Sequence, residues 1–167
     1  LPLAHSVPTF GFRLEETERR RFIPEKLAAM GVHGTMVGEL RRKGELTVQG
    51  KTVRLDEVSV RRRGSSFAFI MDTRPCPEAV ALGRDADLLL MEATYTSEHE
   101  ELAVAYLHST AVDAARTALA AGARSLLLGH FSQRYGDTDQ HLREAAAIFP
   151  EVQALRDLDR VEIPRMY

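Results

Sequence analysis

The sequence predicts an α/β fold in which strands alternate with helices, and three observations support this expectation. From Ser65 onward, short apolar runs alternate with segments of helical periodicity, as in folds built from βα units. Three of the apolar runs end in a polar residue that can carry chemistry, namely Asp72, Glu92 and His130. Ahead of this regular part lies a segment of short elements that is rich in Lys and Arg. We therefore expect a layered βα fold with a charged insertion on its surface.

The N-terminal third is expected to hold short elements. Residues 7–15 alternate apolar and polar side chains, which is typical of a strand. Helices are expected at 24–30 and 35–43, because Pro can begin a helix and Gly can end one. Apolar alternation on both sides of Gln49-Gly50-Lys51 predicts a β-hairpin over residues 46–55.

The remainder of the chain is expected to hold the sheet and its helices. The helix that ends at Ala121 has the clearest boundaries, because Thr110 and Asp113 match a capping box and Gly122 follows the last turn. The sequence predicts further strands at 67–71, 87–91, 125–129 and 161–163, and further helices at about 77–84, 97–106 and 138–148.

Charge separates the two parts of the chain. Residues 13–63 hold 13 Lys/Arg and 8 Asp/Glu, whereas the whole chain has a net charge of -2. Basic clusters occur at 19–21, 41–43 and 61–63. One such cluster alone is usually a solvated face, but three in one insertion favour contact with phosphates. We therefore expect an insertion at 16–63, with the main fold formed by 1–15 and 64–167.

Each candidate site residue also has a purely structural explanation. Asp72 is either a carboxylate delivered by a strand to a site or an ordinary turn residue. His130 is either a metal ligand or a histidine bonded to a backbone carbonyl. His108 is either a general acid or a marker of a helix junction, and Glu92 is either its partner or part of a salt bridge. His5 is uninformative by itself, and the remaining histidines, His33, His99 and His141, are expected at the surface.

Composition indicates the cellular compartment of the protein and argues against membrane association. Cys76 is the only cysteine, which excludes an intrachain disulfide and fits a reducing compartment, so we expect a cytoplasmic protein. The longest apolar runs are too short to span a bilayer, and no membrane association is expected. The chain begins Leu1-Pro2 without Met, and we expect it to be a fragment or processed piece.

Five stretches, taken in order, resemble the ribonuclease Z family, the tRNA 3′-processing endonucleases of the metallo-β-lactamase superfamily. Their order and spacing agree across essentially the whole chain. The stretches are Pro2-Leu3-Ala4-His5 with Phe10-Gly11-Phe12-Arg13-Leu14-Glu15-Glu16, Met71-Asp72-Thr73-Arg74-Pro75-Cys76, Met91-Glu92-Ala93-Thr94, His108-Ser109-Thr110, and Gly129-His130-Phe131-Ser132-Gln133-Arg134-Tyr135.

The resemblance implies a site built on zinc. It assigns His5 to one zinc ion, His130 to the other and Asp72 to a bridging position, with two zinc ions per complete site and Mn or Mg possible in their place. It also implies that His108 and Glu92 assist departure of the leaving group. The expected activity is removal of 3′ trailers from precursor tRNA by a metal-bound hydroxide, which leaves a tRNA 3′-OH.

The resemblance also implies partners for this chain. It makes residues 16–63 a protruding arm that holds tRNA, with RNA-binding side chains at Arg19, Arg20, Arg21, Arg41, Arg42 and Lys43. The family is typically homodimeric. The family's His-x-His-x-Asp-His cluster is absent, so we expect the C-terminal half of an αββα sandwich that needs the N-terminal half, on the same or a separate chain, for activity.

Three local departures accompany the resemblance. Gly31-Val32-His33-Gly34-Thr35 replaces the Gly-Pro-rich turn of the arm, Met71 replaces a Gly and Met91 replaces a His.

Two other functions are compatible with the same residues. One is a hydrolase of small phosphodiesters from the same superfamily, and the other is a non-catalytic RNA-binding half.

Overall fold

A computed structural model describes residues 1–163, and within it the chain divides into two compact units. Among the described residues, one unit contains residues 1–16 and 65–163, and the other contains Thr17–Gly64. The two units are described separately below. Within residues 1–163, no helix combines the length and the apolar character that crossing a bilayer requires.

The larger unit is built on a five-stranded sheet with the strand order β1-β6-β7-β8-β9. Strand β1 is antiparallel to β6, whereas β6, β7, β8 and β9 run parallel to one another. Parallel strands that are covered by helices usually consist of short apolar runs. The sequences of β6, β7 and β8 fit this rule. The bounds are Phe12–Glu15 for β1, Ser66–Ile70 for β6, Leu88–Glu92 for β7, Leu126–Gly129 for β8 and Val152–Ala154 for β9.

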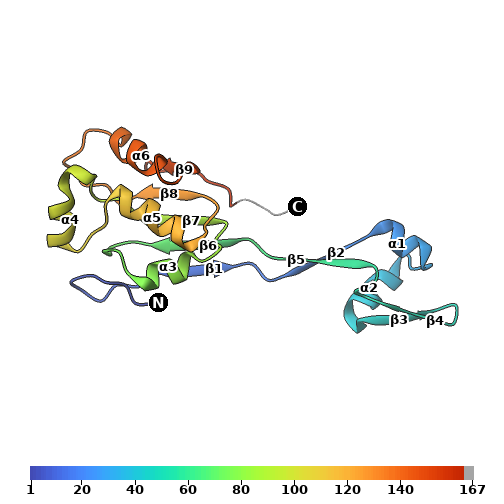
Figure 1. Ribbon diagram of the computed structural model, residues 1–167. Helices are drawn as coiled ribbons and strands as arrows, with labels where there is room; N and C mark the ends of the chain where they lie inside the picture. Colours follow the sequence, from blue (N-terminus) through green and yellow to red (C-terminus); the bar gives the residue numbers. More distant parts are fainter. Residues whose placement is uncertain (164–167) are drawn as a thin grey trace. The chain divides into compact units, whose positions relative to one another are not determined.

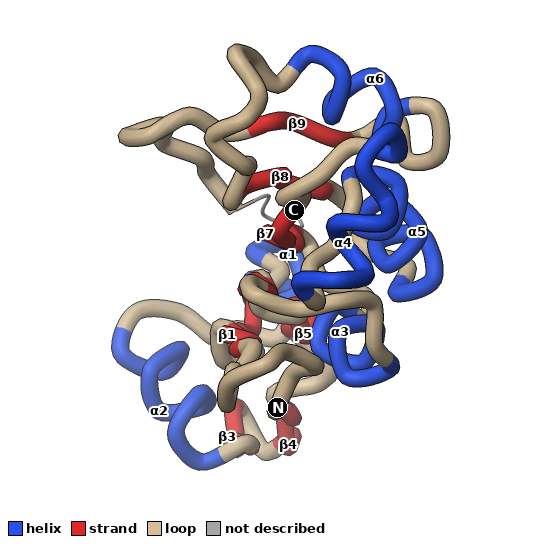
Figure 2. The backbone as a smooth tube through the Cα atoms, turned by 90° about the vertical axis from the view of Figure 1, so that its left-hand side faces the viewer, coloured by secondary structure: helices blue, strands red, loops and turns tan. Residues whose placement is uncertain are grey.

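Helices cover one face of this sheet. Figures 1 and 2 show α3 (Pro77–Gly83), α5 (Ala111–Ala121) and α6 (Asp139–Ala146) on the same side of the strands. A 3-10 turn at Ser97–His99 leads into the remaining helix, α4 (Glu100–Tyr106). The core under the helices contains alternate residues of the central strands and the small side chains of α5, which let the helix approach closely: Ala68, Ile70, Leu89, Met91, Leu126, Leu128, Ala111, Ala114, Ala115 and Ala118.

The opposite face of the sheet carries exposed apolar side chains. Phe12 lies opposite Phe69, and Phe69 lies beside Leu90, so the register places these three in one row. Phe12 is 60% exposed, Leu14 65% and Phe69 36%. Phe12 and Leu14 of the predicted alternation therefore lie on an uncovered face, whereas Phe10 is exposed but precedes β1.

The smaller unit holds two two-stranded ribbons and two helices around its own small core. Its elements are β2 (Arg19–Phe22) paired with β5 (Ser59–Arg62), α1 (Pro24–Ala29), α2 (Thr35–Lys43), and the hairpin of β3 (Glu45–Val48) with β4 (Lys51–Arg54). Its buried apolar residues are Leu27, Val32, Leu40, Val48, Val53 and Val58.

The structure confirms most of the elements that the sequence predicts. The hairpin turns at Gln49-Gly50, and α5 has a complete capping box between Thr110 and Asp113 with left-handed Gly122 at its end. The strand predicted at 161–163 was wrong, because these residues form no regular element and the last strand is Val152–Ala154.

One strand was not predicted, and one further prediction was wrong, each for an identifiable reason. Strand β2 was missed, because its sequence Arg19–Phe22 is nearly all Arg and a two-stranded ribbon imposes no apolar alternation. His141 was expected at the surface but is fully buried. It lies on the inner side of α6, one helical turn before the buried Ala145.

Candidate metal centre and its supporting network

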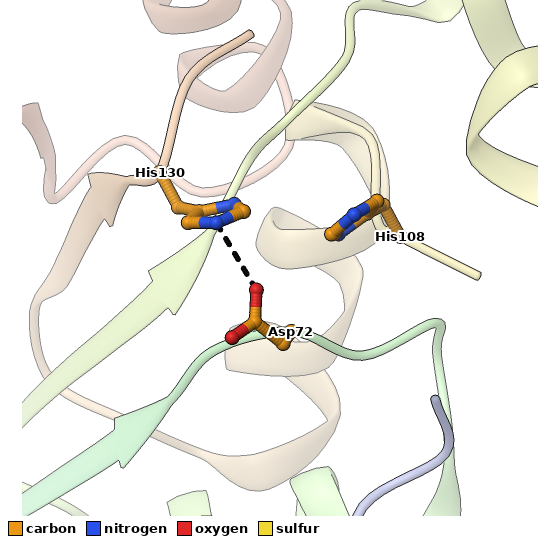
Figure 3. Close-up of side chains that lie close together, drawn as sticks. All are labelled: Asp72, His108 and His130. Atoms are coloured by element: carbon orange, nitrogen blue, oxygen red, sulfur yellow. Dashed lines mark ion pairs between the residues drawn. The ribbon is translucent and has the colours of Figure 1, made fainter. Parts of the chain in front are cut away.

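Three predicted residues meet at one edge of the sheet. Asp72 follows β6, His130 follows β8, and His108 lies between α4 and α5. The Nε2 atom of His130 lies 3.0 Å from Asp72 Oδ1. One ligand atom from each of the three residues lies within 4.8 Å of the others, and Figure 3 shows the side chains converging. Two of the three predicted strand ends, Asp72 and His130, therefore meet here, and His108 joins them from the junction between two helices.

The backbone at this group is in an unusual conformation. Asp72 and His130 have φ angles of 51° and 58°, and Leu107, just before His108, has a φ of 59°. The left-handed region costs a residue with a Cβ on the order of 1–3 kcal/mol and persists only where surrounding contacts impose it. All three donor residues thus lie at, or next to, a left-handed position. Such conformations concentrate at functional sites.

Glu92 makes hydrogen bonds that connect the segments around the site. Its carboxylate is fully buried at the end of β7 and accepts hydrogen bonds from the backbone N–H groups of Thr73 and Ser109, the latter at 3.0 Å. It also accepts from the Thr94 hydroxyl at 2.6 Å and lies 3.0 Å from Nδ1 of His108. These donors compensate the cost of burying the charge. Because Nδ1 of His108 faces Glu92, the opposite edge of the ring, which carries Nε2, is left for the site.

His5 lies beside the group of three but does not belong to it. Its Nδ1 atom is 3.1 Å from the Leu107 carbonyl oxygen, and its ring centroid is 4.9 Å from that of His108. The neighbouring backbone is fixed by Thr73, whose Oγ1 accepts the Ala4 N–H at 3.1 Å. The structure therefore places His5 at the rim of the site, next to His108.

The donor set fits a divalent transition metal. Two imidazoles and one carboxylate are ligand types that zinc accepts, and Mn or Mg would draw mainly on the carboxylate. The His130 and Asp72 side chains are 42% and 45% exposed, so an ion and a substrate can reach them. Zinc is usually four-coordinate, so these residues would share the ion with at least one further ligand.

The predicted RNA-binding side chains lie in the smaller unit, and some have partners. In the β2–β5 ribbon, Arg19 lies opposite Arg62 and Arg20 opposite Arg61. Arg20 donates to Ser59 Oγ and forms an ion pair with Asp56, which lowers the pKa of that carboxyl group. Like charges directly opposite each other in a ladder need counter-charges, and besides Asp56 the ribbon has Glu18, whose Oε1 lies 3.8 Å from Arg61 Nε.

Helix α2 and Arg21 supply the other predicted basic side chains. Arg21 and Arg42 are exposed, and the Arg41 guanidinium lies 5.1 Å from the centre of the Phe22 ring. Lys43 Nζ lies 2.6 Å from Glu39 Oε1, and this hydrogen bond lowers the pKa of Glu39. Lys43 and Arg20 are therefore each paired with a carboxylate of the same unit.

Sequence reasoning did not single out Thr73, Thr94 and Ser109, which connect the site residues to one another. Ser109 Oγ donates to the Thr73 carbonyl at 2.7 Å, and Thr94 Oγ1 lies 2.9 Å from His130 Nδ1. The only signal was their position inside the quoted stretches. Thr73 directly follows Asp72, Ser109 directly follows His108, and Thr94 comes two residues after Glu92.

A sheet of mainly parallel strands, one helical layer and a His/Asp group at the strand ends define an α/β domain of the metallo-β-lactamase fold class. Comparison with known proteins agrees, since a sequence model of the beta-lactamase superfamily domain matches residues 47–131. The chain belongs to this superfamily.

Curated relatives carry a more specific name. The ribonuclease Z of Nocardia farcinica is 48% identical over 163 residues, which cover 97% of this chain and 53% of the relative. The ribonuclease Z of Streptomyces coelicolor is 48% identical over 98% of this chain and 54% of its own length. The resemblance to ribonuclease Z is thereby confirmed. The chain spans about half the length of the curated relatives it matches.

Solved structures support the fold. Human tRNase Z, short form, matches 98% of this chain and 41% of its own with a TM-score of 0.53 and 23% identity. A metallo-beta-lactamase fold protein from Bacillus subtilis matches 66% of this chain and 44% of its own with a TM-score of 0.50 and 23% identity. Both show the metallo-β-lactamase fold predicted from the sequence.

Proposed function

We propose that this chain carries the C-terminal part of a zinc-dependent endoribonuclease that removes 3′ trailers from precursor tRNA. The observation that carries the proposal is the convergence of Asp72, His108 and His130, with Glu92 behind His108, in a chain similar to ribonuclease Z over nearly its whole length. Mn or Mg would be the alternative ions.

The contacts of each residue indicate its role in the proposed reaction. His130, Asp72 and, from the rim, His5 hold the metal ions. Bound zinc supplies a hydroxide near neutral pH and stabilises charge on the phosphate. His108 has Nδ1 engaged by Glu92, which leaves Nε2 to give a proton to the departing 3′ oxygen. His108 is also one of the three possible metal ligands, so it serves as acid only while it does not bind metal.

The exposed sheet face supplies the remaining part of the proposal. Phe12, Leu14 and Phe69 form an apolar surface of the kind that packs against a second sheet in a sandwich. We propose that the N-terminal half of the fold, on the same or a separate chain, covers this face and brings the missing ligands. The complete protein would then work as a homodimer, with residues 16–63 as the arm that holds tRNA.

A complementation assay tests this function. The chain is co-expressed with the N-terminal half of the Nocardia farcinica relative, and cleavage of a precursor tRNA is measured with zinc present. Cleavage that leaves a tRNA 3′-OH, and that is lost in both Asp72→Asn and His130→Ala, is expected. A matched Asp159→Asn variant in the exposed C-terminal loop should keep full activity.

Two outcomes would replace the proposal. Hydrolysis of a small phosphodiester that does not need the arm's arginines, without tRNA cleavage, would indicate a small-molecule hydrolase. Salt-dependent tRNA binding with no cleavage by the complemented protein would indicate a non-catalytic RNA-binding half. This second candidate is favoured by one observation, namely that residues 1–163 bring only three donors together.

A further inference from the structure

The hydroxyl group of Thr94 lies at the centre of the site network. Its Oγ1 atom is 2.6 Å from Glu92 Oε2, 2.9 Å from His130 Nδ1 and 3.0 Å from the His130 carbonyl oxygen. It is also 3.5 Å from His108 Nδ1. The residue is only 6% exposed, so water does not compete for these contacts. One side chain thus touches the acid partner, the acid and a proposed metal ligand.

A count of protons decides the direction of these hydrogen bonds. A threonine hydroxyl has one proton to donate and two lone pairs that accept. The Glu92 carboxylate and the His130 carbonyl oxygen can only accept, and both lie within hydrogen-bond distance of Oγ1. The single proton is therefore committed to these oxygens, most strongly to the carboxylate at 2.6 Å. The contact with His130 Nδ1 must then be one in which the imidazole donates.

This direction fixes the tautomer of His130. When Nδ1 carries the proton, the neutral ring bears its lone pair on Nε2. Nε2 lies 3.0 Å from Asp72 Oδ1, which is also an acceptor. Two acceptors that face each other at this distance repel unless a proton or a metal cation lies between them, and above the titration range of imidazole only the metal can do so. The arrangement is therefore chemically suited to a divalent metal ion.

We propose that Thr94 is a positioning residue that holds His130 in the Nδ1–H tautomer and so presents Nε2, together with Asp72, to a divalent metal. This rests on the metal role given to His130 and Asp72 in the proposed function. Through the same hydroxyl, Thr94 couples the metal ligand to Glu92 and hence to the orientation of His108. Ligand-orienting groups of this kind typically contribute 10–100-fold to metal affinity.

Nitrogen NMR of the metal-free protein tests the tautomer directly. Long-range proton–nitrogen spectra of ¹⁵N-labelled protein are recorded above the pH range in which imidazole titrates. We expect the protonated nitrogen of His130 to be Nδ1 in the wild type and in Thr94→Ser, which keeps the hydroxyl. In Thr94→Val the Nε2–H form should gain population, because Nε2 can then donate to Asp72.

A titration with zinc alone supplies the second readout. Thr94→Val should bind zinc roughly 10–100-fold more weakly than the wild type, and Thr94→Ser should bind about as well. Thr96→Val is the matched control, because Thr96 is also buried but its hydroxyl contacts Tyr135. This control should change neither the His130 tautomer nor the zinc affinity.

The inference fails if wild-type His130 is protonated on Nε2, a result that needs no variant to fold. It also fails if Thr94→Val keeps both the wild-type tautomer and the wild-type zinc affinity. Neither readout involves RNA, so the absence of tRNA cleavage would overturn the proposed function while leaving this assignment intact.

Discussion

The Nδ1 atom of His108 lies 3.0 Å from Oε2 of Glu92, a carboxylate without any exposed surface. The two residues are joined across 16 positions of sequence. Glu92 also accepts two backbone N–H groups, so its position does not depend on His108 alone. A ring fixed by such a partner can present only one nitrogen to a substrate, which is what a general acid requires.

Replacement of Glu92 by Gln should weaken both stability and activity. The amide nitrogen of Gln cannot accept, so at least one of the donors around Glu92 would lose its partner. We expect the free energy of unfolding to fall by about 1–3 kcal/mol, measured by urea denaturation. Glu98→Gln is the matched control, because Glu98 is exposed. An unchanged urea midpoint for Glu92→Gln would show that Glu92 does not hold these groups.

The capping box of α5 predicts a smaller and purely structural effect. Thr110 Oγ1 accepts the Asp113 N–H at 3.1 Å, and Asp113 Oδ2 accepts the Thr110 N–H at 3.1 Å. Thr110→Ala removes the first of these bonds and should cost roughly 1 kcal/mol in unfolding free energy. Thr110→Ser should restore most of it. A loss in Thr110→Ser as large as in Thr110→Ala would mean that the lost methyl, not the cap, is responsible.

His141 predicts a dependence of stability on pH. Its ring is fully buried against Phe131 and Tyr135, and within residues 1–163 neither nitrogen makes a hydrogen bond of normal geometry. Burial lowers the pKa of His141, and the negative charge of Glu144 opposes this shift only in part. The unfolded chain therefore binds a proton more readily than the folded one.

The lowered pKa makes the folded state less stable at low pH, because the folded protein binds this proton less readily than the unfolded chain. The contribution of His141 is complete above the ordinary histidine pKa of about 6.5, and it is lost as the pH falls below that value. His141→Phe should flatten the decline of unfolding free energy between about pH 7 and pH 5, where one proton accounts for up to ~1.4 kcal/mol per pH unit. His33→Gln, at an exposed position, serves as the control. A decline as steep in His141→Phe as in the wild type would contradict the assignment.

The arm arginines predict a specific change in salt dependence. Arg41 and Arg42 are exposed on α2, whereas Arg20 is paired with Asp56. The double variant Arg41→Ala, Arg42→Ala should lower the slope of log affinity against log salt by about 2 for precursor tRNA, and Arg20→Ala should lower it less. Arg116→Ala, on the exposed side of α5, should leave the slope unchanged. Equal slopes in the double variant and the wild type would remove these residues from the RNA-binding surface.

The sequence by itself determined the features that depend on neighbours along the chain. Apolar runs that end in Asp72, Glu92 and His130 predicted three strands of the βα fold and the polar groups that follow them. The capping box at Thr110 and the turn at Gln49-Gly50 were predicted for the same reason. Local periodicity and turn chemistry act over a few residues, so they can be recognised without knowing the fold.

Only the tertiary structure decided how the site is held. The left-handed backbone of Asp72 and His130 has no local signal, because residues with a Cβ avoid it unless distant contacts impose it. The partners that converge on Thr94 and Glu92, and the burial of His141, depend on segments far apart in sequence. Hydrogen bonds and burial of this kind arise when elements pack, and packing is not encoded in any one stretch of the chain.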